Sequence, residues 1–302
     1  MKTVWLLVVA ILMAALAPMC GAAEAKKSAP RYNGKPGAKI GDMCVNPKDG
    51  AEMVWVPGGE FLMGSSEEQN ATALNNWPAE YRLFAKSILA TEMPQRKINL
   101  NGYWMYRYEV TVAQYRKFCR ETGRDMPPKP EAGWKDNRPM AMVAWQDAAD
   151  YAKWASAALP TEAQWEKAAR GTEARIFPWS DKWDASKCAN SLEKQITIPR
   201  PVGSYPSGAS PYGCMDMAGN VAEWCADWFD PNYYKDAPAK NPTGPAKAVT
   251  FTVQVGTFQG ARVLRGGSCD RNNNDYLRCA SRSYYNPASF NDYLGFRCAR
   301  TP

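Results

Sequence analysis

The apolar residues follow two patterns along the chain, short runs typical of strands and the spacing typical of helices. Together the two patterns predict an α+β fold. Short apolar runs bounded by Gly, Pro or polar residues are typical of strands. The last predicted strand ends at Val263-Leu264, and Gly266-Gly267 then lets the backbone turn or pass close to a neighbour. The expected short, twisted strands cover 53–56, 61–63, 98–108 and the residues up to 264.

Helical spacing of apolar residues indicates two or three helices in the middle of the chain. In the first, 111–123, Thr111 and Gln114 have the pattern of a capping box, and the final glycine is placed to end the helix. The second spans 144–156. The third, 161–171, begins with the same Thr-x-x-Gln pattern.

The remaining segments are rich in polar residues, Gly and Pro, and they predict much irregular loop. Residues 66–96 are expected to form a surface loop, and the chain after 174 is expected to form loops supported by small strands. Residues 26–50 are rich in Lys, Gly, Pro and Ser and are expected to be a flexible leader. We therefore place one folded domain at 51–302.

Residues 1–25 have the pattern of a signal peptide. A lysine near the start is followed by an apolar run, 4–17, that is too short to span a bilayer comfortably. Small residues around 21–25 offer a cleavage site. Cys20 raises the alternative of a lipid anchor, but Pro18-Met19 before it are poor for a lipoprotein signal. We expect an exported protein, periplasmic or secreted, with no transmembrane span.

Composition supports a globular domain and excludes several kinds of chemistry. The 302 residues are 45% hydrophobic and include 12 Trp and 15 Tyr, which are expected mainly in the core. Net charge is +7, but the Lys and Arg residues are scattered, so no basic face for nucleic acid is expected. The chain has no histidine. This excludes a Ser-His-Asp triad, a Cys-His nucleophile pair, His-ligated zinc and facial-triad iron.

Nine cysteines are present, and eight remain if Cys20 is removed with a signal peptide. An even number in an exported protein indicates disulfides, either a full set of four or two to three together with buried thiols. Cys225 and Cys269 lie in segments that we expect to be neighbouring strands, and we hypothesise a bridge between them. The eight are Cys44, Cys119, Cys188, Cys214, Cys225, Cys269, Cys279 and Cys298.

Five sequence blocks stand out along the chain. They are VWVPGGEFLMGS (54–65), YEVTV (108–112), LPTEAQWE (159–166), MAGNVAEW (217–224), and the motifs RGGS, RCASR and LGFRC within 265–298. In this order the blocks resemble the sulfatase-modifying factor family. Its domain is that of the formylglycine-generating enzymes, a variant of the C-type lectin fold, and the resemblance implies this fold for roughly residues 51–300.

The resemblance raises one possible activity, oxidation of a sulfatase cysteine to formylglycine. Members with this activity bind Cu(I) through two closely spaced cysteines in the loop before RCAxR, and soft thiolates suit Cu(I). Here that loop, 270–277, contains no cysteine, and Cys269 and Cys279 are ten residues apart, which is not the family spacing. Only Ser268 matches cleanly, and Tyr293 replaces a substrate-site Asn. If the chain is an enzyme, Ser268, Cys269 and Cys279 are its candidate catalytic residues.

The resemblance also implies structural calcium. A hard cation prefers several oxygen ligands from carboxylates and carbonyls. The matching ligands are the side chains of Asp216 and Glu223 and the carbonyls of Gly219 and Val221. From the residues alone the signal is weak, because acidic residues around a turn are usually solvated. A second, incompletely matched family site would contain Asn190 and the Ser191 carbonyl.

Four arginines in the C-terminal part allow two interpretations. They could line an anionic pocket, because guanidinium groups bind anions well. Alternatively, they could pair with Asp and Glu around the core. The four are Arg265, Arg278, Arg282 and Arg297.

Two functional classes follow from these features. In the first, the chain is an exported binding or structural module, stabilised by calcium, whose cleft takes an unidentified protein or small ligand. In the second, it is a copper- and oxygen-dependent oxidoreductase of the formylglycine-generating type that acts on a sulfatase-like polypeptide. The missing cysteine pair favours the first class, and the sequence leaves open whether the chain is an enzyme.

Overall fold

The computed structural model describes residues 29–192, 197–253 and 256–302, so the expected signal peptide lies outside them. The described residues form six α-helices and twelve strands, which confirms the α+β class. The helices are α1 (Glu67–Asn75), α2 (Arg82–Leu89), α3 (Val112–Thr122), α4 (Trp145–Trp154), α5 (Glu162–Arg170) and α6 (Tyr233–Asp236). The strands are β1 (Met43–Val45), β2 (Glu52–Val56), β3 (Gly59–Met63), β4 (Arg96–Leu100), β5 (Tyr103–Tyr106), β6 (Ala222–Trp228), β7 (Thr250–Val253), β8 (Gly256–Gln259), β9 (Arg262–Arg265), β10 (Ser283–Tyr285), β11 (Leu294–Gly295) and β12 (Ala299–Arg300).

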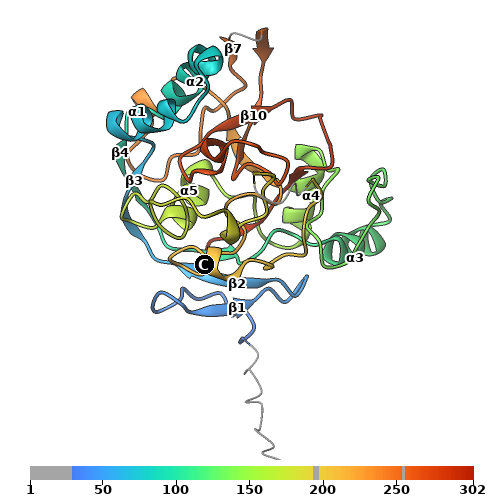
Figure 1. Ribbon diagram of the computed structural model, residues 1–302. Coiled ribbons are helices and arrows are strands. Elements are labelled where there is room, and N and C mark those ends of the chain that lie inside the picture. The colour runs from blue at the N-terminus through green and yellow to red at the C-terminus, as the bar shows by residue number, and fades with distance from the viewer. Residues whose placement is uncertain (1–28, 193–196, 254–255) are drawn as a thin grey trace, which may run out of the picture.

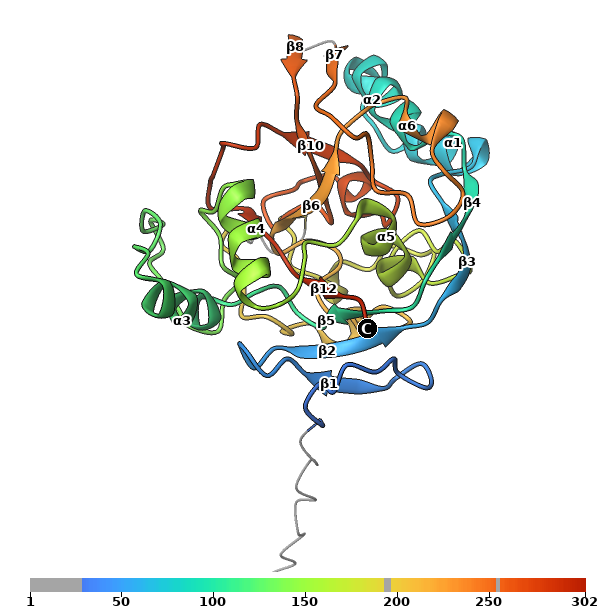
Figure 2. The ribbon, with the colours of Figure 1, turned by 180° about the vertical axis from the view of Figure 1, so that it is seen from behind.

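A four-stranded sheet in the order β1-β2-β5-β12 forms the base of the molecule (Figures 1 and 2). Its strands supply two hydrophobic cores, because successive side chains of a strand point to opposite faces. Trp55 and Trp104 belong to the cluster that also contains the buried residues of α3 and α4. Val54 and Met105 belong to the cluster around α5. The sheet therefore lies between the two cores.

A second sheet, in the order β10-β9-β6-β11, leads to the candidate site. β6 and β9 are antiparallel, with Glu223 opposite Arg265, while β11 runs parallel to β6. β9 is followed by Gly266 and Gly267, whose φ angles are 87° and 64°. A Cβ on Gly267 would lie 2.7 Å from the Tyr276 carbonyl oxygen, so glycine is required here.

The three predicted helices are confirmed as α3, α4 and α5. Both predicted capping boxes form, with Thr111 and Gln114 at the start of α3 and Thr161 and Gln164 at the start of α5. Gly123 ends α3 in the left-handed region, with φ 72°. The local signals in the sequence were therefore sufficient to place these helix ends.

The prediction of a surface loop at 66–96 is wrong, because this segment contains α1 and α2. Ser66 caps α1 through a capping box of its own. α2 is amphipathic, with Ala85 and Leu89 buried and Leu83 73% exposed. The helical pattern was hidden because α1 is mostly polar and each helix is short.

Part of the expected flexible leader belongs to the folded domain. β1 pairs with β2, which places Cys44 opposite Met53 in a buried position. The Tyr32 N–H donates to the Val45 carbonyl at 2.9 Å. Ordered structure therefore begins before residue 51.

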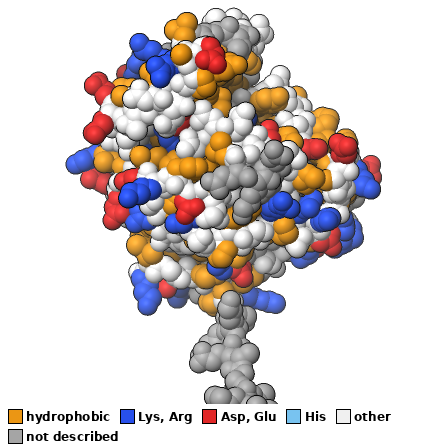
Figure 3. All heavy atoms as spheres, viewed as in Figure 1, with side chains coloured by type: hydrophobic (Ala, Val, Ile, Leu, Met, Phe, Trp, Pro, Cys, Tyr) orange, Lys and Arg blue, Asp and Glu red, His pale blue; other side chains and the backbone are white. Residues whose placement is uncertain are grey.

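Two further observations concern the outside of the molecule. No helix among the described residues has the length and apolar character needed to cross a membrane. On the face seen in Figure 3, Lys and Arg side chains are interspersed with Asp and Glu. This face therefore carries no extended field of one sign.

Candidate functional site

Buried ion pairs fix the floor of the candidate site. Glu162, the first residue of α5, accepts hydrogen bonds from Arg282 at 2.8 and 2.9 Å and from Arg265 at 3.3 Å. Glu166, one turn later, accepts from Arg265 at 2.5 Å and from Arg170 at 2.7 Å. All five side chains are buried. Because a buried charge is tolerated only when it is paired, the network ties α5 to the strand residues beneath the site.

The four arginines singled out in the sequence all form buried ion pairs, so the second interpretation is confirmed and the anionic-pocket interpretation is wrong. Arg265 and Arg282 belong to the network just described. Arg278 donates to both oxygens of Glu92 at 2.9 and 2.8 Å, and Arg297 pairs with Glu223. Their positive charges are therefore paired with buried glutamates inside the fold.

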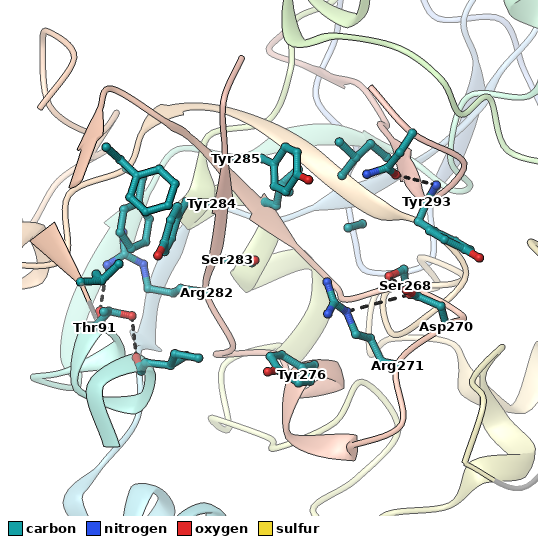
Figure 4. Close-up of a pocket in the computed structure, with 18 of the residues that line it drawn as sticks. Thr91, Ser268, Asp270, Arg271, Tyr276, Arg282, Ser283, Tyr284, Tyr285 and Tyr293 are labelled. Carbon is teal, nitrogen blue, oxygen red and sulfur yellow. Dashed lines mark hydrogen bonds and ion pairs between the residues drawn. The ribbon is translucent and has the colours of Figure 1, made fainter. Parts of the chain in front are cut away.

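A cavity of about 450 Å³ opens above this floor. Its walls come from α2, the β7–β8 hairpin, β10, the loop 268–276 and the turn before β11. Ser283 and Tyr285 of β10 lie in its middle, and Tyr284 lies toward one side (Figure 4). Its volume lies in the range of small-molecule sites.

One end of the cavity is polar. Ser268, Asp270 and Arg271 gather there next to Tyr276 (Figure 4). The Ser268 hydroxyl donates to Asp270 Oδ1 at 2.5 Å. The Arg271 guanidinium lies 4.9 Å from the centre of the Tyr276 ring, and its Nε is 4.0 Å from the same Asp270 oxygen. Ser268 is thus the family-matched residue that reaches the cavity, whereas Asp270 and Arg271 were not predicted as site residues.

The other end is aromatic. Phe229, Phe251, Phe258 and Tyr284 form a cluster with ring centres 4.5 to 5.4 Å apart. β7 and β8 pair only with each other among the described strands, so this cluster joins their hairpin to the rest of the fold. The sequence did not predict this end of the cavity. The chain after residue 174 was expected to form loops supported by small strands, and no hairpin was singled out there.

The structure does not bring Cys269 and Cys279 together. Cys269 packs in a small cluster with Tyr205 and Tyr293, while Cys279 packs in the core around α5 with Trp165. Neither cysteine lines the cavity. Burial raises the pKa of each thiol to about 12. A copper-binding thiolate pair needs two deprotonated sulfurs close to each other, and this arrangement does not supply one.

The hypothesised Cys225–Cys269 disulfide is not formed. All eight cysteines of the described residues are free and buried. β6 and β9 are neighbours as expected, but Cys269 lies beyond the end of β9, and its N–H donates to the Asn220 carbonyl at 3.0 Å. Cys269 therefore lies beside Asn220, which precedes β6 and is five residues before Cys225 in the sequence. The two sulfur atoms are not bonded.

The predicted calcium ligands lie in different environments. Glu223 is fully buried, and its two oxygens accept from Arg297 at 2.7 Å each and from the Trp165 indole at 2.8 Å. Asp216 is also buried, but no arginine donates to it within the described residues; its Oδ2 accepts from the Gly203 N–H at 2.6 Å. Asp216 therefore fits a cation site, whereas the charge of Glu223 is already neutralised.

Glu109, which the sequence did not single out, completes the group around Asp216. It is buried, its Oε1 accepts from the Asn220 amide at 3.0 Å, and its Oε2 has no partner among the described residues. Burial and the nearby Asp216 charge raise the pKa of Glu109 well above its usual range. Burial likewise raises the pKa of Asp216 to about 6. Two buried carboxyl groups with an unused oxygen are chemically suited to a hard cation.

The remaining predicted calcium ligands have contacts of other kinds. Gly219 has φ 77° and approaches so closely that a Cβ would lie 2.0 Å from the Ala189 carbonyl oxygen, and Val221 is fully buried. Asn190 is buried and its amide donates to the Ala185 carbonyl at 2.9 Å. The Ser191 hydroxyl donates to the Asp270 carbonyl at 3.1 Å, which ties it to the polar end of the cavity.

The fold and cavity together define an α+β module of the C-type-lectin-like kind with a pocket of ligand size. Sequence comparison identifies the particular family. Residues 39–302 match the family described as "Sulfatase-modifying factor enzyme 1-like domain", and the chain belongs to it. The resemblance found in the five sequence blocks is thereby confirmed.

The relatives include proteins of different kinds. Serine/threonine-protein kinase pkn1 of Chlamydia caviae is 34% identical over 271 residues, which cover 82% of this chain and 38% of that kinase. The formylglycine-generating enzyme of Streptomyces coelicolor is 42% identical over 113 residues, which cover 36% of this chain and 32% of that enzyme. The structure of PvdO from Pseudomonas aeruginosa matches with a TM-score of 0.70 and 25% identity, over 88% of this chain and 100% of PvdO. The chain thus spans 38% of the length of that kinase.

Proposed function

We propose that this protein is an exported, calcium-stabilised binding module whose cavity takes a small ligand. The observation that carries the proposal is the loop 270–277, which borders a cavity of about 450 Å³ and contains no cysteine. The wall instead presents aromatic rings with a few polar groups at one end. That combination is typical of sites that bind and orient a ligand.

Calcium has a structural role in this proposal. Asp216 and Glu109 would supply carboxylate oxygens, with Gly219 and Val221 as candidate carbonyl ligands. The unpartnered Oε2 of Glu109 and the burial of both carboxyl groups support this assignment. A bound cation would remove the repulsion between the two buried acids and so stabilise the fold. Export is proposed from the signal-peptide pattern of residues 1–25.

A ligand screen tests the binding function. Small fragments of neutral, cationic and anionic character are screened by ligand-observed NMR against the wild-type domain and against Ser283→Trp, which would fill the middle of the cavity. Arg120→Trp, on the exposed surface of α3, is the matched control. We expect hits that Ser283→Trp abolishes and Arg120→Trp retains. Hits that are indifferent to Ser283→Trp, or no hits at all, would overturn the proposal.

The alternative is oxidation of a sulfatase cysteine to formylglycine. It is supported by the formylglycine-generating enzymes among the relatives and by Ser268 at the cavity wall. The separate, buried positions of Cys269 and Cys279 argue against it. Incubation with Cu(I), oxygen and a sulfatase-type cysteine peptide, followed by mass spectrometry, decides between the two classes. Conversion of the peptide cysteine to an aldehyde would establish the oxidase.

A further inference from the structure

The two ends of the cavity differ in chemistry, and this difference specifies a ligand. The aromatic end is lined by Phe84 and Ile88 of α2, by Val253 and Phe258 of the β7–β8 hairpin, and by Tyr284 of β10. These side chains offer only apolar surface and ring faces, apart from one phenol. A ligand that fills this end gains free energy by removing apolar surface from water.

At the polar end, Arg271 has unused hydrogen-bonding capacity. Its guanidinium donates no hydrogen bond to a described residue, and its Nε is buried without a partner. Its contacts are the Tyr276 ring, 4.9 Å away, and the Asp270 oxygen, 4.0 Å from Nε, which is too long for a hydrogen bond. A planar guanidinium group presents its N–H groups in a fixed fork that matches a carboxylate.

The other arginine in the cavity wall is not available in this way. Arg282 donates to Glu162 at 2.8 and 2.9 Å and to the Thr91 carbonyl at 2.8 Å. Its side chain is buried in the floor. Arg271 is therefore the cation of the described cavity wall that can pair with a ligand.

The neighbouring Asp270 limits the charge that the ligand can carry. It lies beside Arg271 and also accepts from the Ser268 hydroxyl, so its carboxyl group is held in place. A dianion such as a phosphate monoester would be repelled by this carboxylate, and an ammonium group would be repelled by Arg271. A single negative charge placed on the far side of the guanidinium is attracted by Arg271 and is repelled by Asp270 less than a dianion would be.

On the basis of the proposed binding function, we propose that the ligand is a small monocarboxylate with an aromatic or branched apolar body. Its carboxylate pairs with Arg271 in the cavity that Asn291 and Tyr285 also line. Its apolar body lies between α2 and the β7–β8 hairpin. Figure 4 shows Arg271 at one side of the cavity and Tyr284 at the other, with Tyr285 and Ser283 between them.

Paired probes test this assignment. Phenylbutyrate, indole-acetate and 4-methylpentanoate are each compared with their primary amides by calorimetry, on the wild type, on Arg271→Gln and on Phe258→Ala. Arg120→Gln, on exposed α3 surface, is the matched control. We expect at least one acid to bind wild type and Arg120→Gln about tenfold more tightly than its amide, because a charge-assisted hydrogen bond is lost in the amide. In Arg271→Gln the acid and amide should bind equally, and Phe258→Ala should weaken both.

The possible failures are distinguishable. If acid and amide bind the wild type equally and Phe258→Ala weakens both, the carboxylate assignment is overturned, while the cavity remains a ligand site. If phenyl phosphate binds more tightly than every acid, a dianion is preferred and the assignment is again overturned. If no acid binds, this inference fails, and the fragment screen with Ser283→Trp separately decides the binding function. The wild-type comparison of acid and amide does not depend on whether any variant folds.

Discussion

Arg297 donates to both carboxylate oxygens of Glu223 at 2.7 Å, and both side chains are fully buried. This pair joins β6, which contains Glu223, to the chain just before β12, which contains Arg297. Arg297 also donates to the Met215 carbonyl at 2.9 Å. The interaction explains why Glu223 is poorly suited to bind a metal in this fold. It also makes the pair a sensitive point for stability.

Arg297→Met should destabilise the domain strongly, because it leaves the Glu223 charge buried and unpaired. We expect a loss of about 3–5 kcal/mol in the free energy of unfolding, measured by urea denaturation. Arg116→Met, which breaks the exposed pair with Asp136, should change it by less than about 1 kcal/mol. Adding Glu223→Gln to Arg297→Met should recover part of the loss. Equal effects of the buried and exposed changes would contradict the role of burial.

Calcium should stabilise the wild-type domain and not Glu109→Gln. A ligand at a hundredfold excess over its Kd adds about 2.7 kcal/mol to the free energy of unfolding. We therefore expect calcium to raise the Tm of the wild type, and to raise it far less in Glu109→Gln or Asp216→Asn. Glu68→Gln, on the exposed surface of α1, is the control and should respond like the wild type. A wild-type Tm that is indifferent to calcium and to chelator would remove calcium from the proposal.

Asp227 should make stability depend on pH. Burial raises its pKa from 3.8 to about 8, and its Oδ2 accepts from the Glu162 N–H at 2.9 Å. The folded state therefore binds a proton that the unfolded state has released, so this contribution is complete below about pH 4 and is lost as the pH rises toward 8. Asp227→Asn should flatten the pH dependence of the urea midpoint in this window. An unchanged slope in the variant would show that other groups are responsible.

The thiols of the domain should be free and unreactive in the folded state. We expect alkylation under denaturing, non-reducing conditions to modify all eight cysteines, as measured by intact mass. In the native state, burial and raised pKa values should make the same reaction slow at Cys269 and Cys279. A mass that shows fewer free thiols, with peptides cross-linked through Cys225 and Cys269, would restore the disulfide hypothesis.

Phe251→Ala should loosen the β7–β8 hairpin without unfolding the domain. Phe251 is buried and lies 5.1 Å from Phe229 and 5.0 Å from Tyr284, measured between ring centres. We expect faster hydrogen exchange in the hairpin and little change in β9, because the hairpin is joined to the fold mainly through this cluster. Thr257→Ala, on the exposed side of the hairpin, should have a much smaller effect. A uniform increase across the domain would contradict this.

Local signals account for the part of the structure that the sequence could predict. Capping boxes at Thr111 and Thr161 placed α3 and α5, and the motif RGGS singled out Ser268, which lines the cavity. The rest depends on contacts between distant segments. Glu109 meets Asn220 across 111 residues, and Arg282 meets Glu162 across 120. No periodicity or spacing in the sequence indicates which charged residue pairs with which. The buried ion pairs and the buried position of Glu109 could therefore be found only from the fold.

The two ends of the described chain lie at the pole opposite the cavity. β1 and the C-terminus lie at the base in Figures 1 and 2, while α2, the hairpin and β10 lie toward the top. A fusion partner, an affinity tag or an immobilising surface joined at either end would therefore leave the cavity mouth open to solution. The same geometry would let one such module be appended to another folded unit without obstructing the cavity.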